Sequence, residues 1–311
     1  MKMKKRFFAA LMAGVMSLSL FGCSVDGEQK SNTDSNTATG EGSIGLSIST
    51  MNNPFFVTLS EGAKEKANEL GVELIQVDAG DDSAKQSSDI EDLISKNIKV
   101  LIVNPVDSDA VAPAVEDAIA KGIKVISVDR VVNGVDVDCA IASDNVAGAE
   151  MVGEYLVEVL GEGAKVAELE GVNGASATID RGQGFHNVAD SKLNVAASQT
   201  ANFNRAEGMS VMENMLQANP DLKGVFAHND EMALGAIETI GGKDILVAGF
   251  DATDDAIAAV KEGRMAATVA QKPDLMGATA VETAKKLMSG ESVEKSIPVE
   301  VKLITKDNVN E

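Results

Sequence analysis

The sequence is poor in residues that bind metals, form disulfides or act as catalytic bases. Its 311 residues include two histidines, two cysteines and no tryptophan. Neither His186 nor His228 has a cysteine or a second histidine at metal-ligand spacing, so we predict no metal site. His186 falls in a predicted helix, whereas His228 follows a strand and is a candidate to border a cleft.

Motifs for nucleotide and covalent chemistry are missing as well. The chain has no G-x-x-x-x-G-K phosphate loop, no G-x-G-x-x-G after a strand and no G-x-S-x-G elbow. No nucleophile is paired with a base. We therefore predict no cofactor, no catalytic residues and no enzyme activity; an enzyme acting on sugars is the alternative that these absences disfavour.

Acidic residues far outnumber basic ones, and the net charge is −21. Such a chain repels phosphate backbones, which argues against nucleic acid as a partner. Hydrophobic residues make up 44% of the sequence, enough for folded cores. The length predicts about two domains of ~150 residues.

The N-terminus carries a targeting signal. Residues 1–22 contain a basic start (2–6) and an apolar run (7–20) that is shorter than the ~20 residues of a membrane span. Small residues before Cys23 resemble the bacterial lipoprotein signal, in which the cysteine is lipidated. We predict a receptor outside the cytoplasm, held on the cell membrane by lipid such as palmitate. The alternative is an ordinary secretory signal with an incidental cysteine.

Residues 23–42 are predicted to be the lipidated cysteine and a flexible tether, since Ser, Thr, Asn, Asp and Gly dominate them. With Cys23 lipidated, Cys139 has no partner, and no intrachain disulfide is expected. The apolar stretch around Cys139 predicts a small core residue there.

From Ser43 onward, strand and helix patterns alternate, which predicts parallel sheets with helices on both faces. The alternation falls into two halves, beginning at Ser43 and near Asp144. Helices are predicted over 54–70, 82–97, 204–218 and 273–289. Strands are predicted over 44–49, 72–77, 99–104, 124–129, 164–169, 193–198, 223–228, 244–250, 266–271 and, as one piece, 297–304.

Polar and aromatic residues gather where these strands end. Open α/β sheets bind ligands outside the carboxyl ends of their strands. Amides, acids, arginines and phenylalanine rings suit a neutral polyhydroxylated ligand, held by hydrogen bonds and ring faces. The strand-end residues are Ser49, Asn104, Asp129, Arg130, Asn229, Asp230, Phe250, Asp251 and Gln271.

Seven segments, in order and at near-constant spacing, resemble the D-ribose-binding proteins, solute receptors of bacterial ABC importers in the pentose/hexose-binding class of periplasmic binding protein type I. The resemblance implies an α/β fold of two similar doubly wound parallel-sheet lobes joined by a three-segment hinge. It implies an N-terminal lobe of 43–143 plus 272–300 and a C-terminal lobe of 144–271 plus 301–311. The segments are STMNNPFF (49–56), VNPVDSDAV (103–111), SVDR (127–130), ASDN (142–145), FAHNDEMALGA (226–236), VAGFD (247–251) and TVAQKPD (268–274).

The same resemblance implies the ligand-binding residues. Phe185 and Phe226 are assigned to the core, and Ile179 departs from the basic residue that relatives often carry there. The implied ligand-binding residues are Ser49, Asn53, Phe55, Phe56, Asn104, Asp129, Arg130, Arg181, Phe203, Asn229, Phe250, Asp251 and Gln271.

The function implied is a monomeric receptor that binds D-ribose between its lobes and delivers it to ABC permease membrane subunits. A chemoreceptor is a further candidate partner. Allose, another pentose or a furanosyl signal molecule are alternative ligands. A sugar-responsive transcription regulator shares the fold, but it needs a DNA-binding helix where this chain has a signal and a tether.

Overall fold

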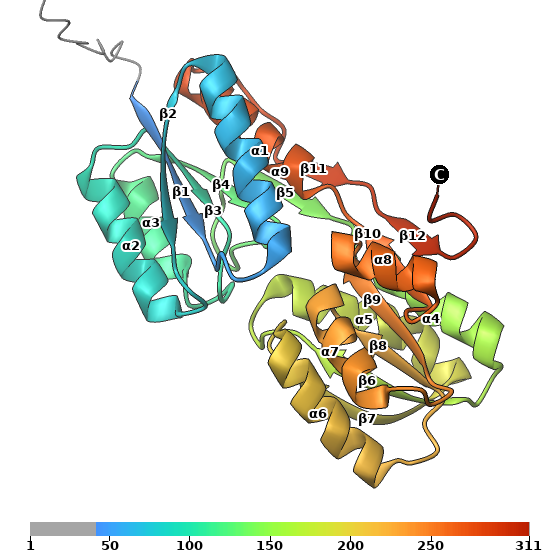
Figure 1. The fold of residues 1–311 in the computed structure, drawn as a ribbon. Coiled ribbons are helices and arrows are strands. Elements are labelled where there is room, and N and C mark those ends of the chain that lie inside the picture. The colour runs from blue at the N-terminus through green and yellow to red at the C-terminus, as the bar shows by residue number, and fades with distance from the viewer. Residues whose placement is uncertain (1–41, 311) are drawn as a thin grey trace, which may run out of the picture. The chain divides into compact units, whose positions relative to one another are not determined.

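The computed structural model describes residues 42–310, so the predicted signal peptide, Cys23 and nearly all of the tether lie outside the described residues. The described strands form two separate six-stranded sheets, each covered by helices (Figure 1). We call the parts built around them the N-terminal lobe and the C-terminal lobe.

The sheet of the N-terminal lobe is parallel throughout, in the order β11-β5-β4-β3-β1-β2. Its central strands are buried on both faces, which is why they read as short apolar runs. The strands are β1 (Ser43–Ile48), β2 (Glu73–Asp78), β3 (Val100–Val103), β4 (Lys124–Val128), β5 (Cys139–Ser143) and β11 (Ser296–Val299).

Two pairs of helices cover this sheet. Helices α1 and α9 pack on the face that carries Ile44, Leu46 and Ile48, and α2 and α3 pack on the face that carries Leu101 and Val103. The four helices are α1 (Pro54–Leu70), α2 (Ser83–Ser95), α3 (Ala112–Ala120) and α9 (Pro273–Met288).

The sheet of the C-terminal lobe has the order β12-β10-β9-β8-β6-β7, and only β12 runs antiparallel to its neighbour. The strands are β6 (Lys165–Glu170), β7 (Asn194–Thr200), β8 (Gly224–Ala227), β9 (Leu246–Asp251), β10 (Ala267–Ala270) and β12 (Lys302–Thr305).

Helices again cover both faces of this second sheet. The core between the sheet and α6, α7 and α8 contains Met212 and Met232, and the core beneath α4 and α5 contains Phe185 and Phe226. The helices are α4 (Asn145–Leu160), α5 (Ser176–Lys192), α6 (Arg205–Ala218), α7 (Asp230–Ile240) and α8 (Asp254–Glu262).

The chain crosses between the lobes three times: from β5 to α4, from β10 to α9 and from β11 to β12. The predicted fold of two doubly wound lobes joined by three segments is therefore confirmed. The single strand predicted over 297–304 is wrong, because the chain changes sheets within it. Residues 300–301 separate β11 from β12, and strand periodicity cannot show where the hydrogen-bonding partner changes.

One strand was missed from the sequence. β5 has only five residues and follows a loop, and it pairs with both β4 and β11. Cys139 is fully buried in β5 as a free thiol, so the prediction of a small core residue is confirmed. Burial raises the pKa of this thiol.

Local signals fix where α1 begins and ends, and thereby where its two phenylalanines lie. Asn53 Oδ1 accepts a hydrogen bond from Phe55 N (2.9 Å), and Pro54 occupies the first helical position. Gly71 ends the helix in the left-handed conformation, with φ of 64°. Phe55 and Phe56 consequently stand on the first turn of α1, at the carboxyl end of β1.

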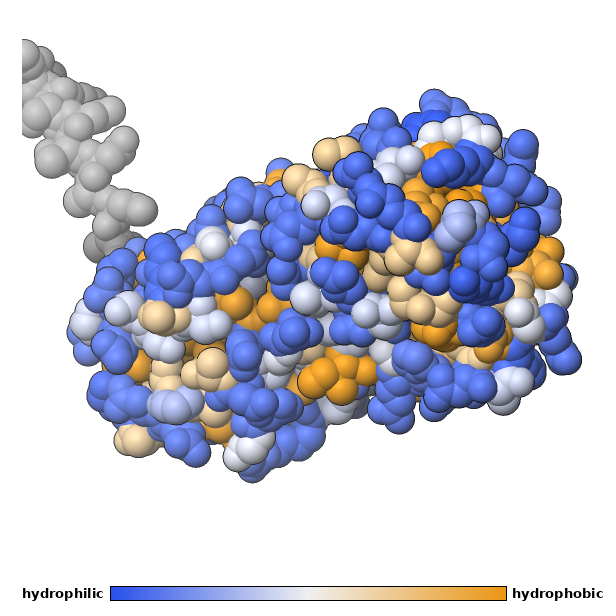
Figure 2. All heavy atoms as spheres, turned by 90° about the horizontal axis from the view of Figure 1, so that it is seen from below, coloured by the Kyte–Doolittle hydropathy of each residue, from blue (hydrophilic) through white to orange (hydrophobic). Residues whose placement is uncertain are grey.

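Hydrophilic residues dominate the face shown in Figure 2, with smaller apolar areas between them. Among residues 42–310, no helix combines the length and apolar character needed to cross a bilayer.

Helices α1 and α9 approach so closely that glycine is required at their crossing. A Cβ on Gly62 would lie 2.2 Å from Asp274 O, and one on Gly277 would lie 2.0 Å from Leu59 O. We predict that Gly277→Ala lowers the free energy of unfolding by about 1–3 kcal/mol through overpacking. Gly242→Ala, which has nothing within 4 Å of its added Cβ, should change it by less than about 0.5 kcal/mol. Equal denaturation midpoints for the two variants would contradict this packing.

Candidate functional site

A small cavity lies where strands of both sheets end. The side chains stand close together there and leave about 10 Å³ for the centre of a water molecule, roughly the room of a single water. The lining residues are Asn53, Phe55, Phe56, Asp129, Arg130, Ala177, Arg181, Phe203, Asn229, Asp251 and Gln271.

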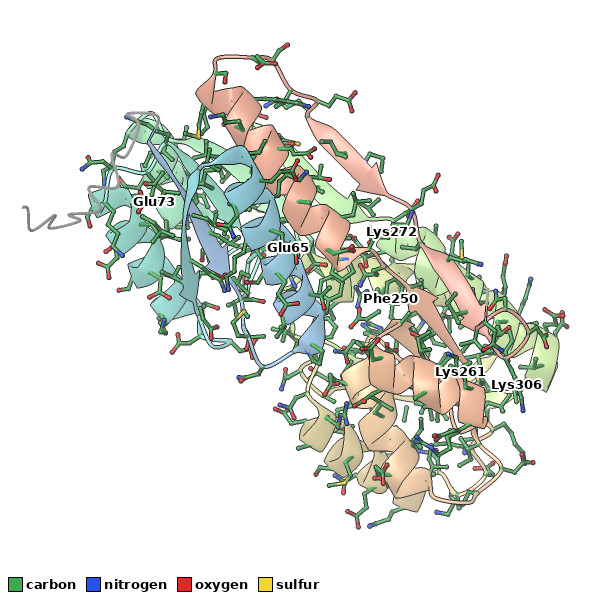
Figure 3. All side chains as sticks on the ribbon, turned by 45° about the horizontal axis from the view of Figure 1, so that its top comes forward. Glu65, Glu73, Phe250, Lys261, Lys272 and Lys306 are labelled. Atoms are coloured by element: carbon green, nitrogen blue, oxygen red, sulfur yellow. The ribbon has the colours of Figure 1, made fainter. Side chains whose placement is uncertain are left out.

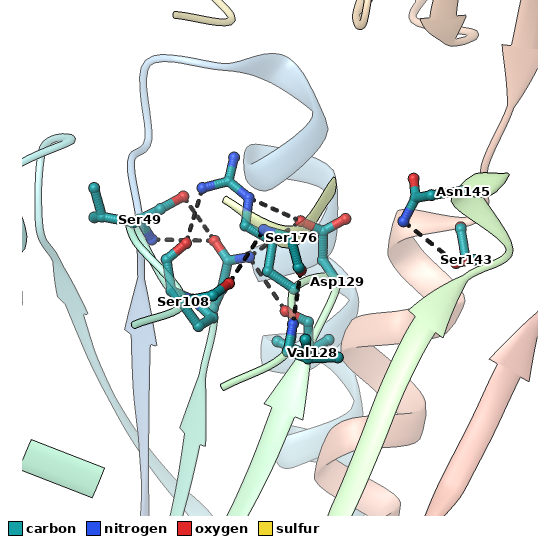
Figure 4. A network of polar contacts seen from close by, with 12 residues as sticks. Ser49, Ser108, Val128, Asp129, Ser143, Asn145 and Ser176 are labelled. Atoms are coloured by element: carbon teal, nitrogen blue, oxygen red, sulfur yellow. Dashed lines mark hydrogen bonds and ion pairs between the residues drawn. The ribbon is translucent and has the colours of Figure 1, made fainter. Parts of the chain in front are cut away.

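Asp129 is held in place from behind by a chain of polar groups. Asn104 Nδ2 donates to Asp129 Oδ2 (3.1 Å), and Asn104 Oδ1 accepts from Ser49 Oγ (2.7 Å) (Figure 4). Asp129 has a φ of 65°, and its N–H donates to Ile141 O (2.7 Å). Burial raises the pKa of this carboxyl. Asn104 and Ser49 therefore orient an acid that faces the cavity.

Arg130 lies between two aromatic rings. Its Cζ is 5.2 Å from the centroids of both Phe56 and Phe203, and its Nη1 donates to Pro105 O (2.8 Å). Its buried Nε has no hydrogen-bond partner and lies 3.6 Å from Asp129 Oδ2. Burial lowers the pKa of this guanidinium. Both phenylalanines also line the cavity, and the Nε remains without a hydrogen bond.

Arg181 of α5 is fixed by two acceptors. Its Nε donates to Asn145 Oδ1 (2.8 Å) and its Nη1 to His228 O (2.5 Å). The guanidinium lies 3.9 Å from the ring centroid of Phe250, which comes from the end of β9 (Figure 3). Burial lowers the pKa of Arg181 as it does that of Arg130.

Asp251 completes the polar wall. Its Oδ1 accepts from Gln271 Nε2 (2.7 Å) and lies 3.7 Å from Arg181 Nη1. Burial raises the pKa of Asp251 well above its usual value. Gln271 Oε1, like Arg130 Nε, is buried without a hydrogen-bond partner. Two residues of the cavity lining thus carry an unpaired buried atom, a donor on Arg130 and an acceptor on Gln271, and such groups are rarely left unpaired.

Beside the cavity the lobes touch through hydrogen bonds. Ser176 N donates to Ser108 Oγ (3.1 Å), and Ser176 Oγ accepts from Val131 N (3.0 Å) (Figure 4). Ser108 N donates to Gly174 O (2.9 Å). These bonds join loops of the N-terminal lobe to the start of α5, so the lobes are closed over the cavity.

Of the thirteen residues that the sequence predicts as ligand contacts, the structure brings ten to the cavity lining. Ser49, Asn104 and Phe250 do not line it: the first two support Asp129, and the third lies against Arg181. His228, the candidate cleft neighbour, is buried and does not line it either.

Two residues were missed by sequence reasoning. Ala177 lines the cavity, and its small side chain has no polar or aromatic group that would mark it as a site residue in the sequence. Asn145 orients Arg181 and belongs to the ASDN segment already singled out, so its place in that motif was the available signal. In residues 42–310, no group of three or more His, Cys, Asp or Glu side chains is arranged to hold a metal ion.

Two α/β lobes closed on a polar cavity define a two-lobed solute-binding protein. Residues 44–292 match the family model of the periplasmic binding protein domain, and the chain belongs to this family. Membership confirms the predicted class and the prediction of a binding protein rather than an enzyme.

Individual members of the family show which binding proteins this chain is similar to. The chain is 50% identical to a ribose import binding protein of Bacillus subtilis over 94% of this chain and 97% of the relative. It is 46% identical to the ribose import binding protein of Escherichia coli over 88% and 94% of the two chains. The crystal structure of a Caulobacter myo-inositol binding protein matches with a TM-score of 0.84 at 32% identity, covering 88% and 96%.

A buried acid next to the site gives a test by pH. Asp230 begins α7 and accepts bonds from Thr268 Oγ1 (2.6 Å) and Thr253 N (2.8 Å). Burial outweighs these donors and raises its pKa from 3.8 to about 7. The protonated native carboxyl stabilises the fold below about pH 4, and that contribution is lost as pH rises through about 7.

We predict that Asp230→Asn removes this loss in the sugar-free protein. The difference in unfolding free energy, variant minus wild type, should therefore increase from pH 4 to pH 8, by at most about 4 kcal/mol. Denaturant titrations at several pH values measure it. Parallel pH profiles for the two proteins would show that Asp230 is ionised throughout.

Proposed function

We propose that this protein binds D-ribose in the cavity, closes its lobes around the sugar and delivers it to the membrane subunits of an ABC importer. The unpaired Arg130 Nε and Gln271 Oε1 carry the proposal, because a hydroxyl can satisfy each of them. The ribose-import relatives support the choice of sugar.

The chemistry of the wall fits a neutral sugar. A carboxylate such as Asp129 or Asp251 can accept from two neighbouring hydroxyls, and an arginine fork can donate to two oxygens. Phe56 and Phe203 offer apolar faces to the C–H groups of the ring. A micromolar dissociation constant needs ~8 kcal/mol, well below the ceiling of roughly 15 kcal/mol for ten heavy atoms.

Binding and closure are coupled in this arrangement. The lining residues come from both lobes, so a ligand that contacts both favours the closed state. We place the lobe boundaries at 43–143 plus 272–300 and at 144–271 plus 301–311, and we propose that the receptor acts as a monomer. A chemoreceptor is a further candidate to recognise the closed form.

Another monosaccharide of similar size is the second candidate ligand. A myo-inositol binding protein has the same fold, and allose, another pentose or a furanosyl signal molecule are the alternative ligands.

Calorimetry with ribose, allose and arabinose tests this function. We predict that wild-type protein binds ribose most tightly and that Arg181→Ala weakens binding from about 30-fold to several thousand-fold, since it removes a fixed donor to the sugar and the cation that lies 3.7 Å from buried Asp251. Arg264→Ala, which removes an exposed arginine paired with Glu262, should bind as the wild type does. Unchanged ribose binding by Arg181→Ala would contradict the assignment of this cavity as the ribose site.

We also propose that Cys23 carries the lipid anchor. Cys23→Ala should abolish incorporation of radioactive palmitate and release the receptor from the membrane fraction into the medium or periplasm. Cys139→Ala is the matched control, since that thiol is buried in β5, and it should leave labelling intact. Labelled Cys23→Ala protein would rule out this anchor.

A further inference from the structure

A buried acid of the C-terminal lobe lies outside the cavity wall. Glu168 in β6 accepts hydrogen bonds from His228 Nε2 (2.9 Å), His186 Nε2 (3.1 Å) and Ser198 Oγ (2.7 Å). Burial opposes its ionisation, but these donors, His228 first among them, bring the pKa of Glu168 below its usual value. Burying a carboxylate is costly even when donors surround it, so its partners merit a functional explanation.

The ring of His228 is held at both nitrogens and against one neighbouring aromatic ring. Glu168 holds its Nε2, and the ring of Phe226 lies at a centroid distance of 5.2 Å. Gly171 N donates a long hydrogen bond to Nδ1, at 3.5 Å. Both His228 and Glu168 have side chains that are 1% exposed. The ring therefore anchors the main chain at the end of β8.

That main chain reaches the sugar site. His228 N donates to Leu169 O (2.9 Å), and His228 O accepts from Arg181 Nη1 (2.5 Å). Together with Asn145 Oδ1, this carbonyl holds Arg181 Nη1 at 3.7 Å from Asp251 Oδ1. A direct charge-assisted bond would be about 2.7–2.9 Å long. The guanidinium and the carboxylate thus face the cavity without being bonded to each other.

We propose that His228, anchored by Glu168, is a positioning residue for sugar binding. Its carbonyl keeps Arg181 from closing onto Asp251, so both groups stay available to the ligand. Without the anchor, the carbonyl shifts and Arg181 pairs with Asp251, and a sugar must then break that pair. This inference rests on the proposed ribose-binding function.

Calorimetric titration with ribose compares four proteins. His228→Leu should weaken binding about tenfold, the equivalent of one good hydrogen bond. His228→Gln should restore affinity to within about threefold, because its amide can donate to Glu168 as Nε2 does. Ser198→Ala removes another donor from Glu168 and is the matched control; its ribose affinity should stay within about twofold of the wild type.

The melting temperature of each sugar-free protein separates affinity from stability. A purely structural ion pair would let His228→Leu and Ser198→Ala melt earlier while both bind ribose normally, and that result would overturn the proposal. It would also fail if His228→Gln bound as weakly as His228→Leu. Should the leucine variant not fold, His228→Asn, whose shorter amide stops short of Glu168, gives the same comparison.

A double-mutant cycle tests the route through Arg181. In an Arg181→Lys background, the effect of His228→Leu should fall below about twofold, because lysine lacks the fork that spans both acceptors. An undiminished effect would show that His228 acts elsewhere. If wild-type protein binds no ribose, the proposed function fails, and the same variants are then titrated with whichever monosaccharide binds.

Discussion

The structure depends on keeping two guanidinium groups and two carboxylates out of water between the lobes. Arg130, Arg181, Asp129 and Asp251 are each at most 7% exposed. Such burial is tolerated only when hydrogen bonds satisfy most of the polar atoms. Main-chain carbonyls and amide side chains do so, and two residues of the cavity lining, Arg130 and Gln271, each keep one buried polar atom without a hydrogen bond. The ligand preference follows from which atoms are left.

The fold supplies those partners in a regular way. In each lobe the parallel strands end at the same edge, so side chains far apart in sequence meet there. Three crossings link the lobes, and the lining residues come from both. A sugar that contacts both walls therefore shifts the equilibrium toward closure, which couples recognition to a change that an importer can detect.

Most of the cavity residues could be predicted from the sequence, because residues at strand ends are recognisable as polar groups that follow short apolar runs. Asp129, Asp251 and Gln271 were found in this way, and the structure places them at the cavity. Ser49 and Asn104 follow the same pattern but face inward, toward Asp129. Pattern alone could not separate the two groups, because both sit at strand ends and differ only in orientation.

The sequence by itself determined the alternation of strands and helices, the caps of α1 and the chemical character of the site, since these depend on local periodicity and residue type. Only the tertiary structure decided that residues 297–304 are divided between two sheets. It also decided that Asn145 and the His228 carbonyl hold Arg181 3.7 Å from Asp251. Those outcomes depend on which partner each backbone and side-chain group meets, and residues distant in the chain supply that partner.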